Sequence, residues 1–426
     1  MIDIKQIREK PEAFKAACEA KKFEVDIDKL LSVDAELRTV KQQLQDISTE
    51  KNRIGKSIPK LPPDEKEAAL SQLSELKQRE TEYNEDLKNL QPQFDELMQQ
   101  LPQPADEDVP IGKDDTENVE IRKEGQIREF DFEPKDHVQL GLALGIIDIE
   151  RGVKLAGTRN YFLKGDGALL HWAILRFAMD TMVGKGYVPL SVPLLMKDEA
   201  MQGTGYYPGS EDQTYRMEKD ELNLVGTAEV PLTAFRMGEI VDAEELPLKY
   251  VALSSCFRRE AGAAGKDTYG LYRIHQFDKV EQVVICENSD EVSHKYHDEI
   301  LANAEAVMQA LELPYRVVNV CTGDLGRGQA KKYDIEAWMP SRGAYCETHS
   351  ASKFYEFQAR RMNLRYKDPT TRKNLFCHTL NNTVIASPRI LIPILELYQN
   401  SDGSITIPEV LRPYMNGRER IVNSEA

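Results

Sequence analysis

The sequence has few cysteines, and none of them is spaced as in the common metal and redox motifs. Six cysteines occur among 426 residues, and no two are separated by only two positions. Scattered cysteines indicate free thiols in a reducing compartment, so we expect a cytoplasmic protein. Two loose pairs, Cys346 with His349 and Cys377 with His378, leave a zinc site as a weak alternative.

Long apolar segments are missing as well. No uninterrupted apolar run approaches the roughly 20 residues that a helix needs to cross a bilayer. The first ten residues mix charges of both signs and lack the apolar stretch of a secretory signal. Apolar residues still make up 41% of the chain, enough for the cores of two or three globular domains. We therefore expect a globular protein with no membrane partner.

Basic residues are outnumbered by acidic ones. The chain has 55 Lys and Arg against 71 Asp and Glu, which gives a formal net charge of −16. Such a polyanion repels nucleic acid at long range, which argues against a DNA partner and against general capture of RNA. An RNA partner would have to be recognised through local basic patches.

Two segments near the start of the chain carry heptad patterns. Their apolar residues alternate in steps of three and four, as in helices that bury a seam against each other. The first seam contains Leu30, Val33, Leu37, Val40, Leu44, Ile47 and Ile54. The second contains Leu73, Leu76, Tyr83, Leu87, Leu90, Phe94, Leu97 and Leu101.

The residues between the two seams predict a turn. The helix breakers there are Gly55, Pro59, Pro62 and Pro63. Asp64 can cap the following helix. Since the two segments are similar in length, we expect an antiparallel hairpin over about residues 27–101, some 45 Å long, within an N-terminal domain of residues 1–110.

The tip of this hairpin is basic although the hairpin as a whole is acidic. Four basic residues lie there with no acid between them: Lys51, Arg53, Lys56 and Lys60. The heptads alone favour a plain dimerisation or scaffold coiled coil. A basic tip on an acidic rod favours instead a local contact with phosphates.

The rest of the chain predicts an α+β domain over residues 111–426. Proline and acidic residues at 102–118 are typical of a linker. Helical patterns cover 167–187 and about 290–312. Strand-like runs cover 246–257, 271–286, 315–321 and 333–339. Many antiparallel-looking strands among helices favour an α+β class over an alternating parallel one.

Residues 257–281, FRREAGAAGKDTYGLYRIHQFDKVE, predict a charged hairpin. Side chains alternate along a strand, so Arg258 and Glu260 should share one face. One face of the return strand should carry Arg273, His275, Phe277, Lys279 and Glu281. A guanidinium can hold a phosphate through two hydrogen bonds, and an aromatic ring can stack on a base.

The connection of this hairpin is too long for a tight turn. It contains Gly262, Gly265 and Gly270, and we expect it to form an ordered cap over a ligand. An ion-paired surface hairpin is the alternative. The outgoing strand also carries Val251, Leu253 and Phe257, which makes an exposed face less natural.

A second polar cluster occurs at 380–399. Asn381, Asn382 and Thr383 precede Pro388, which should open an apolar helix with Arg389 in its first turn. A helix N-terminus favours anions, and an arginine adds a full charge. Pro393 should cost about 3 kcal/mol inside this helix unless a kink absorbs it.

These segments resemble the motifs of a known enzyme family. FRRE followed by RIHQFDKVE resembles motif 2 of the class II aminoacyl-tRNA synthetases, the stretch with Arg389 resembles motif 3, and 167–193, ending in Pro193, resembles motif 1. The whole chain is similar to the seryl-tRNA synthetases. The segments that carry this similarity include TAEVPLT (227–233), CTGDLGRGQAKKYDIEAW (321–338), FQARR (357–361) and IPEVLRPYM (407–415).

The resemblance implies a fold and a reaction. The fold is an antiparallel sheet with flanking helices, preceded by a coiled-coil arm that guides serine tRNA, in a homodimer. The reaction uses ATP and Mg²⁺ to convert L-serine to seryl-adenylate and then loads the 3′ end of the tRNA. No catalytic His or Cys is expected, because the attacking carboxylate is already ionised. Charging of a selenocysteine tRNA stays open.

The resemblance also implies site residues. The catalytic pair is Arg258, on the α-phosphate and the serine carboxylate, and Arg389, on the γ-phosphate. The ATP-binding residues are Arg258, Arg259, Glu260, Phe277, Glu347, Thr348, His349, Ser350 and Arg389. Glu347 and Ser350 should position Mg²⁺. The serine-binding residues are Thr227, Ala228, Glu229, Arg258, Glu281 and Thr383. The tRNA-binding residues are Lys51, Arg53, Lys56 and Lys60.

The chain departs from the family pattern after Glu347, where His349 and Lys353 are unusual. Side-chain roles at these two positions are therefore not implied. Three alternatives remain open: a carrier other than tRNA, another small amino acid, or an inactive coiled-coil interaction protein. The presence of both Arg258 and Arg389 opposes the last.

Overall fold

The computed structural model describes residues 1–262 and 268–423, so Gly265 of the expected cap lies outside the described residues. The chain forms two compact units, Ile2–Pro102 and Gln103–Ala426, the second of which also includes Met1. No helix in the described part of the chain is both long and apolar enough to span a membrane.

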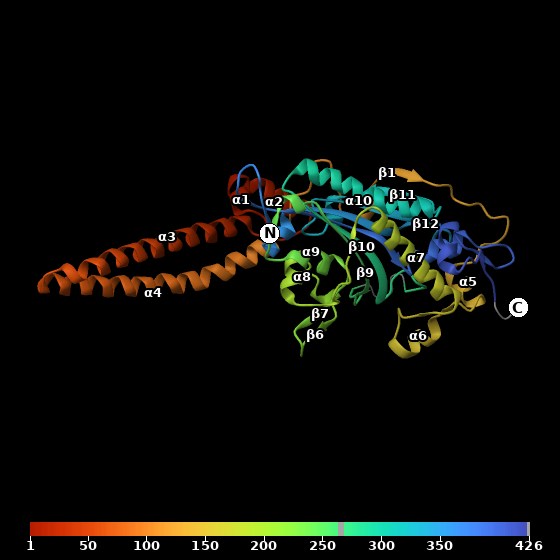
Figure 1. Ribbon diagram of the computed structural model, residues 1–426, viewed down its shortest axis with the longest axis horizontal. Coiled ribbons are helices and arrows are strands. Elements are labelled where there is room, and N and C mark those ends of the chain that lie inside the picture. The colour runs from red at the N-terminus through yellow and green to blue at the C-terminus, as the bar shows by residue number, and fades with distance from the viewer. Residues whose placement is uncertain (263–267, 424–426) are drawn as a thin grey trace. The chain divides into compact units, whose positions relative to one another are not determined.

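The first unit is built around a long helical hairpin. Its helices are α1 (Ile4–Glu9), α2 (Pro11–Ala20), α3 (Ile27–Ser57) and α4 (Pro63–Gln100). Helices α3 and α4 lie side by side in Figure 1 and are joined by a short 3₁₀ turn, η1 (Ile58–Lys60). Hydrogen bonds cross between them from Lys41 to Gln91 and from Lys51 to Glu80, which confirms the antiparallel arrangement.

The first predicted seam is buried more completely than the second, in which only Leu76 and Leu101 are buried and the other members are half-buried. In the first, all but Leu44 are buried on α3. Near the tip, Ile47 and Ile54 pack against Ala69 and Leu76 of α4. Apolar side chains at three- and four-residue steps face one partner, which explains why the heptads located this element.

Two details of the turn differ from the prediction. Gly55 does not break α3, which continues to Ser57, because a glycine inside a helix costs only about 1 kcal/mol. Asp64 does not cap α4. The helix begins at Pro63, with Pro62 as its N-cap, and Asp64 lies in the first turn. Proline suits a first helical position because no N–H is needed there.

The second unit contains an eight-stranded sheet in the order β1-β11-β12-β13-β16-β10-β9-β4. Its strands are β1 (Val119–Glu124), β4 (Val188–Pro189), β9 (Leu248–Phe257), β10 (Gln276–Cys286), β11 (Tyr315–Asn319), β12 (Lys331–Met339), β13 (Ala344–Tyr355) and β16 (His378–Ser387). All neighbours are antiparallel except β4, which runs parallel to β9.

Helices and small sheets surround this central sheet. The helices are α5 (His137–Ala143), α6 (Ile149–Ala156), α7 (Asp166–Gly184), α8 (Asp198–Thr204), α9 (Glu229–Thr233), α10 (Asp290–Ala310), α11 (Phe357–Met362) and α12 (Leu391–Leu397). The short strands are β2 (Ile147–Asp148), β3 (Phe162–Leu163), β5 (Leu195–Met196), β6 (Arg216–Met217), β7 (Leu222–Leu224), β8 (Ile240–Asp242), β14 (Arg365–Lys367), β15 (Asn374–Phe376), β17 (Ile405–Thr406) and β18 (Arg420–Ile421).

The main core lies between the central sheet and helices α7 and α10 (Figure 1). On β10, Val280 and Val284 belong to this core, whereas Phe277 and Lys279 point to the opposite face. The alternation of side chains thus separates the main core from the opposite face, which carries Phe277 and Lys279 at one end and a second apolar cluster with Val283 and Ile285 at the other.

The chain enters the second unit earlier than the predicted domain boundary at 110. Backbone N–H groups of Gln103 and Asp106 donate to the carbonyls of Arg327 and Ala330, and Val109 is buried beside Val318. Residues 103–110 therefore lie in the second unit.

Two central strands were not predicted. β13 and β16 lie in the middle of the sheet, and β16 carries Thr383 on to Ser387. Arg389 consequently lies in the turn before α12 and not in its first turn. Pro393 is the third residue of α12, where an N–H has no partner inside the helix, so the expected cost does not arise.

Candidate active site

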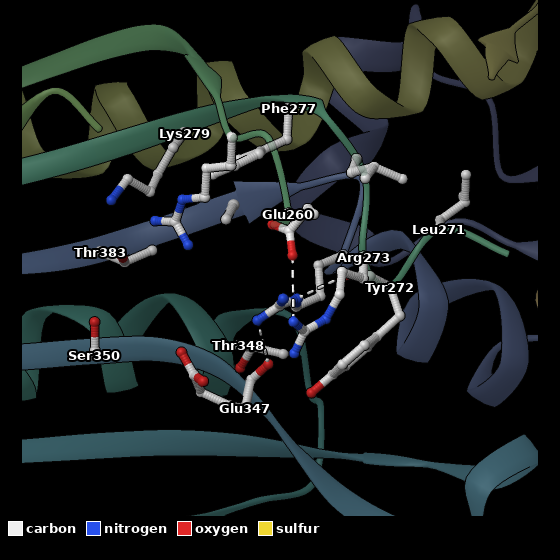
Figure 2. A pocket seen from close by; sticks show the side chains of 14 residues that line it. Glu260, Leu271, Tyr272, Arg273, Phe277, Lys279, Glu347, Thr348, Ser350 and Thr383 are labelled. Atoms are coloured by element: carbon white, nitrogen blue, oxygen red, sulfur yellow. Dashed lines mark hydrogen bonds and ion pairs between the residues drawn. The ribbon is translucent and has the colours of Figure 1, made fainter. Parts of the chain in front are cut away.

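A pocket of about 580 Å³ opens on the face of the sheet that carries Phe277 and Lys279 (Figure 2). Its walls come from the segment after β9, the segment before β10, β10 itself, β13, β16 and the turn before α12. The lining residues are Arg258, Glu260, Leu271, Tyr272, Arg273, Ile274, Phe277, Lys279, Glu347, Thr348, Ser350, Thr383, Ala386 and Arg389. Segments far apart in the sequence therefore meet at one site.

The predicted hairpin supplies one wall. The Arg258 guanidinium lies 5.2 Å from the centre of the Phe277 ring, and its Nε donates to the Gly226 carbonyl at 3.4 Å. Strand β9 ends at Phe257, and Glu260 has a φ of +53°. Alternation along a strand, on which the prediction relied, therefore does not determine where the Glu260 side chain lies. Arg273 places it instead, because its Nη1 donates to Glu260 Oε2 at 3.3 Å (Figure 2).

Arg389 connects two walls of the pocket. Its Nε donates to the Tyr272 carbonyl at 3.2 Å, and its Nη1 donates to the Glu347 carbonyl at 3.1 Å. The Tyr272 ring also lies 4.4 Å from this guanidinium and 4.0 Å from that of Arg342. Burial raises the pKa of Tyr272 to about 12, so its hydroxyl is neutral at physiological pH.

Glu347 and Ser350 offer oxygen atoms from one strand. Both line the pocket on β13 (Figure 2). Loss of hydration tends to raise the pKa of Glu347. The positive charges of Arg389, Lys332 and Arg258 together have a larger effect and hold this pKa below its ordinary value. Glu347 is therefore an anion whose charge is stabilised by Arg389 and Arg258, two cations that can bind phosphate.

Buried polar groups lie at the floor, around Thr383. Lys279 Nζ and Glu281 Oε2 form an ion pair of 2.5 Å, and Thr383 Oγ1 donates to the same carboxylate at 3.3 Å. Glu281 and Thr383 are 2% and 5% exposed. A small hydroxyl-bearing ligand at Thr383 would meet groups already ordered by one another.

Glu229 is buried nearby, at the start of α9. Gln358 Nε2 donates to it at 2.8 Å and the Tyr206 hydroxyl at 3.2 Å. Burial raises the pKa of Glu229 to about 7, and the charge of Glu281 adds to this effect. The backbone N–H of Glu229 donates to Thr227 Oγ1 at 3.1 Å, which orders the backbone at the start of α9.

The structure does not bring every predicted residue to the pocket wall. Thr227, Ala228, Glu229 and Glu281 are buried and are not among the lining residues, and Arg259 is exposed with its N–H bonded to the Gln213 carbonyl.

The two unusual residues of β13 also lie away from the pocket. His349 is 1% exposed, bonds through Nδ1 to Thr348 Oγ1 at 2.7 Å, and has its pKa lowered to about 4 by burial. Lys353 is fully buried and ion-paired with Asp106 at 2.5 Å.

Six lining residues are absent from the predicted site: the polar Tyr272, Arg273 and Lys279, and the apolar Leu271, Ile274 and Ala386. The sequence placed Arg273 and Lys279 on one face with Phe277, and that alternation was the signal available. The zinc alternative finds no support, since no group of three or more His, Cys, Asp or Glu that could hold a metal occurs within residues 1–262 and 268–423.

The basic tip of the arm is partly neutralised by its own helices. Lys51 is paired with Glu80, and Arg53 with Glu50 just before the basic run. Lys56 and Lys60 are exposed, and neither forms an ion pair with any residue that the structure describes. Two of the four predicted cations are thus freely available.

Comparison with known proteins places this architecture in a class. Residues 213–398 match the model of the tRNA synthetase class II core domain (G, H, P, S and T). The antiparallel sheet is that of a class II aminoacyl-tRNA synthetase, which confirms the predicted fold class.

The relatives narrow the class further. Residues 1–104 match the seryl-tRNA synthetase N-terminal domain. A serine–tRNA ligase of Deinococcus radiodurans is 45% identical over 98% of both chains. The crystal structure of the seryl-tRNA synthetase of Pyrococcus horikoshii complexed with ATP is 39% identical, with a TM-score of 0.93 over 99% of this chain and 100% of that one.

A third relative is more distant but similar in fold. The cytoplasmic serine–tRNA ligase of Naegleria fowleri in complex with AMP is 32% identical, with a TM-score of 0.86 over 97% and 96% of the two chains. The chain belongs to the seryl-tRNA synthetase family.

Proposed function

We propose that the pocket joins L-serine to ATP and that the seryl group then passes to the 3′ end of serine tRNA. The observation that carries this proposal is the meeting of Arg258, Arg389 and Glu347 in one pocket, although they come from three separate segments. ATP and an amino acid carboxylate are both anions, and the two guanidinium groups supply the opposing charge.

ATP lies against the wall formed by the hairpin. Phe277 stacks on the adenine, with Glu260 near its amino group, and Arg259, Thr348 and His349 complete the ATP site. His349 contributes its backbone, because its side chain is buried away from the pocket. Arg258 holds the α-phosphate and Arg389 the γ-phosphate.

Glu347 and Ser350 are suited to hold Mg²⁺. They present a carboxylate and a hydroxyl on one wall of the pocket, and Mg²⁺ prefers oxygen ligands. One or two carboxylates together with substrate phosphates are its usual protein environment, so two protein ligands are sufficient. When bound, the ion supplies charge neutralisation on the phosphate oxygens.

Activation follows from this arrangement. A carboxylate oxygen of serine forms a bond to the α-phosphorus, the bond from that phosphorus to the bridging oxygen breaks, and pyrophosphate leaves. Negative charge grows on the phosphate oxygens as the two anions approach. Arg258 and Arg389 are fixed in advance and stabilise the transition state more than the ground state. A ribose hydroxyl of the tRNA then attacks the seryl carbonyl and releases AMP.

Selectivity for serine arises at the floor of the pocket. Glu281 and Thr383 pair with the serine hydroxyl, while Glu229, Thr227 and Ala228 surround its ammonium group. An analogue without the hydroxyl leaves buried polar groups unpaired, which can reduce the rate by about 10⁴–10⁵. Threonine is excluded only by lack of room, which is a weaker filter of about 10–200-fold.

The arm recognises the tRNA through phosphates and shape. Lys51, Arg53, Lys56 and Lys60 form the contact, with Lys56 and Lys60 as its main cations because they carry no ion pair among the described residues. A local patch of this kind overcomes the repulsion between the acidic chain and RNA.

The active form is a homodimer. Trp172 of α7 is 62% exposed, and Val188 of β4 and Leu253 of β9 are also exposed. These elements pack against one another at the β4 edge of the sheet. Exposed large apolar side chains at one edge favour burial against a second copy of the chain. We place this dimer in the cytoplasm.

Pyrophosphate exchange into ATP, measured with each amino acid in turn, tests the substrate. We expect exchange with serine alone. Exchange driven best by threonine or alanine would overturn the substrate assignment. Charging of serine tRNA in the same preparation tests the carrier, and adenylate formation without charging would favour another carrier.

A further inference from the structure

The segment just before β10 carries pocket residues without belonging to a strand. Leu271, Tyr272, Arg273 and Ile274 all line the pocket, whereas β10 begins at Gln276. A loop that presents binding groups must be held by contacts elsewhere if its side chains are to keep one geometry.

His137, the first residue of α5, holds the backbone of this loop. The Leu271 N–H donates to His137 Nε2 at 3.2 Å, and Leu271 and His137 are 0% and 4% exposed. Because Nε2 accepts, the ring proton is on Nδ1, which donates to Glu396 Oε1 at 2.8 Å. The imidazole thus connects the loop to α12.

Glu396 is fully buried and oriented by several donors. Its carboxylate accepts from the His137 N–H at 3.1 Å, the Ser341 N–H at 2.9 Å and the Ser341 hydroxyl at 2.7 Å. Every one of these bonds limits its rotation. A carboxylate held in this way fixes both the tautomer and the direction of the histidine ring.

The neighbouring residues confirm how close the loop lies to His137. A Cβ added at Gly270 would lie 2.1 Å from His137 Nε2, and Gly270 also has a φ of +71°. Only glycine fits there. The Tyr269 hydroxyl donates to Asp136, the N-cap of α5, at 3.0 Å. Three consecutive loop residues therefore contact the beginning of one helix.

The same loop is held from the other side by Arg389, through the Tyr272 carbonyl. Leu271 is thus tied to Glu396 and Tyr272 to Arg389, at the two ends of one short segment that includes α12. Neither His137 nor Glu396 lines the pocket.

We propose that His137 and Glu396 are positioning residues for ATP. Glu396 orients the imidazole, the imidazole fixes the Leu271 N–H, and Tyr272 and Arg273 are thereby held at the pocket wall in a geometry that binds the nucleotide. This inference rests on the proposed function, because it assigns ATP to that wall. Of the serine-binding residues, Glu229, Glu281 and Thr383 are held by hydrogen bonds to residues outside 271–274.

Two substitutions separate positioning from packing. In His137→Gln the side-chain amide reaches the position of Nε2 and keeps an acceptor for the Leu271 N–H. In His137→Asn it reaches only the position of Nδ1, so a donor to Glu396 remains and the acceptor is lost. We expect His137→Asn to raise the KM for ATP about tenfold in pyrophosphate exchange, with the KM for serine unchanged. His137→Gln should stay within about twofold of the native KM.

Hydrogen exchange of the Leu271 amide, measured by mass spectrometry without ATP, is the second readout. It should be faster in His137→Asn and close to native in His137→Gln. The matched control is His378→Asn, which removes another buried histidine, bonded to Ser293 at the opposite end of β16 from the pocket. This control should leave the KM for ATP and the Leu271 amide unchanged.

Three results would overturn the proposal: equal effects of the two His137 variants, a parallel rise in the KM for serine, or an unchanged Leu271 amide in His137→Asn. Failure of the proposed function would look different. In that case the native protein would show no serine-dependent exchange, while the Leu271 amide would still respond to His137→Asn.

Discussion

The arm and the catalytic unit place charged side chains in opposite surroundings. On the arm, Lys51 and Arg53 pair with acids on the helix surface. In the catalytic unit, Lys279 and Glu281 are buried almost completely and pair with each other at 2.5 Å. Exposed pairs are worth about 0–1 kcal/mol, whereas breaking a buried pair costs about 3–5 kcal/mol. Replacing a charged residue should therefore change stability little on the arm and much more in the buried pair.

The largest difference should appear when one arginine is removed from each region. We expect Arg389→Ala to lower serine-dependent pyrophosphate exchange about 10³-fold, because it removes a fixed cation from the phosphate site. Arg53→Ala, the matched change on the arm, should leave exchange unchanged. Exchange within tenfold of native for Arg389→Ala would contradict the assignment of Arg389 to ATP.

Replacing one acid in each ion pair compares their contributions to stability. Glu281→Gln leaves the Lys279 ammonium buried without a counter-charge, and we expect a loss of about 3 kcal/mol in urea unfolding of the catalytic unit. Glu80→Gln, which removes the partner of Lys51, should cost less than about 1 kcal/mol. Similar losses for the two variants would show that burial does not distinguish the pairs.

The pH dependence of serine binding is the third comparison. The pKa of Glu229 is raised to about 7, so its carboxylate is protonated below that pH and cannot hold the serine ammonium. We expect the KM for serine to rise about tenfold per pH unit below pH 7 and to be flat above it. Binding of tRNA to the arm should not follow this profile.

Glu229→Gln provides the control, because an amide does not titrate. Its KM for serine should be high and independent of pH in the same range. A native profile that is flat between pH 6 and 8 would contradict the role of Glu229.

The smallest effect is expected at the arm tip. Lys56→Ala with Lys60→Ala should raise the KM for tRNA several-fold and reduce the salt dependence of tRNA binding by about two units of slope, while exchange is unaffected. Lys51→Ala with Arg53→Ala should have a smaller effect, because Glu80 and Glu50 already neutralise those cations. Equal effects of the two pairs would show that these ion pairs open when RNA binds.

The two regions also differ in how far the sequence predicted them. Heptad spacing located α3 and α4 because the apolar residues of a helix seam recur at steps of three and four residues along the sequence. In the catalytic unit, β9, β10, β11, β12 and α10 were predicted from local patterns, but β13 and β16 were missed. Their sequences contain many Ser, Thr and Asn residues, which are mostly exposed in proteins and so do not suggest buried central strands.

The candidate site was also predicted only in part. The resemblance selected Arg258, Glu347, Thr383 and Arg389, and the structure brings all four to one pocket. Tyr272 was missed because nothing in its local sequence shows that two guanidinium groups lie against its ring. The resemblance also selected His349, but its side chain is buried away from the pocket. Which face of a strand is buried depends on the elements that pack against it, and the local sequence does not show them.

The sequence by itself determined the arm, the acidic surface and the residue types that the chemistry needs. A helical hairpin depends on hydrogen bonds and apolar contacts between near neighbours, so its pattern is local. Only the tertiary structure decided which charges meet. Strand pairing brings Glu281 beside Thr383 and sets Arg389 beside Tyr272, and these contacts depend on register between segments far apart in the chain. The energies that hold buried charges in place exist only after that register has formed.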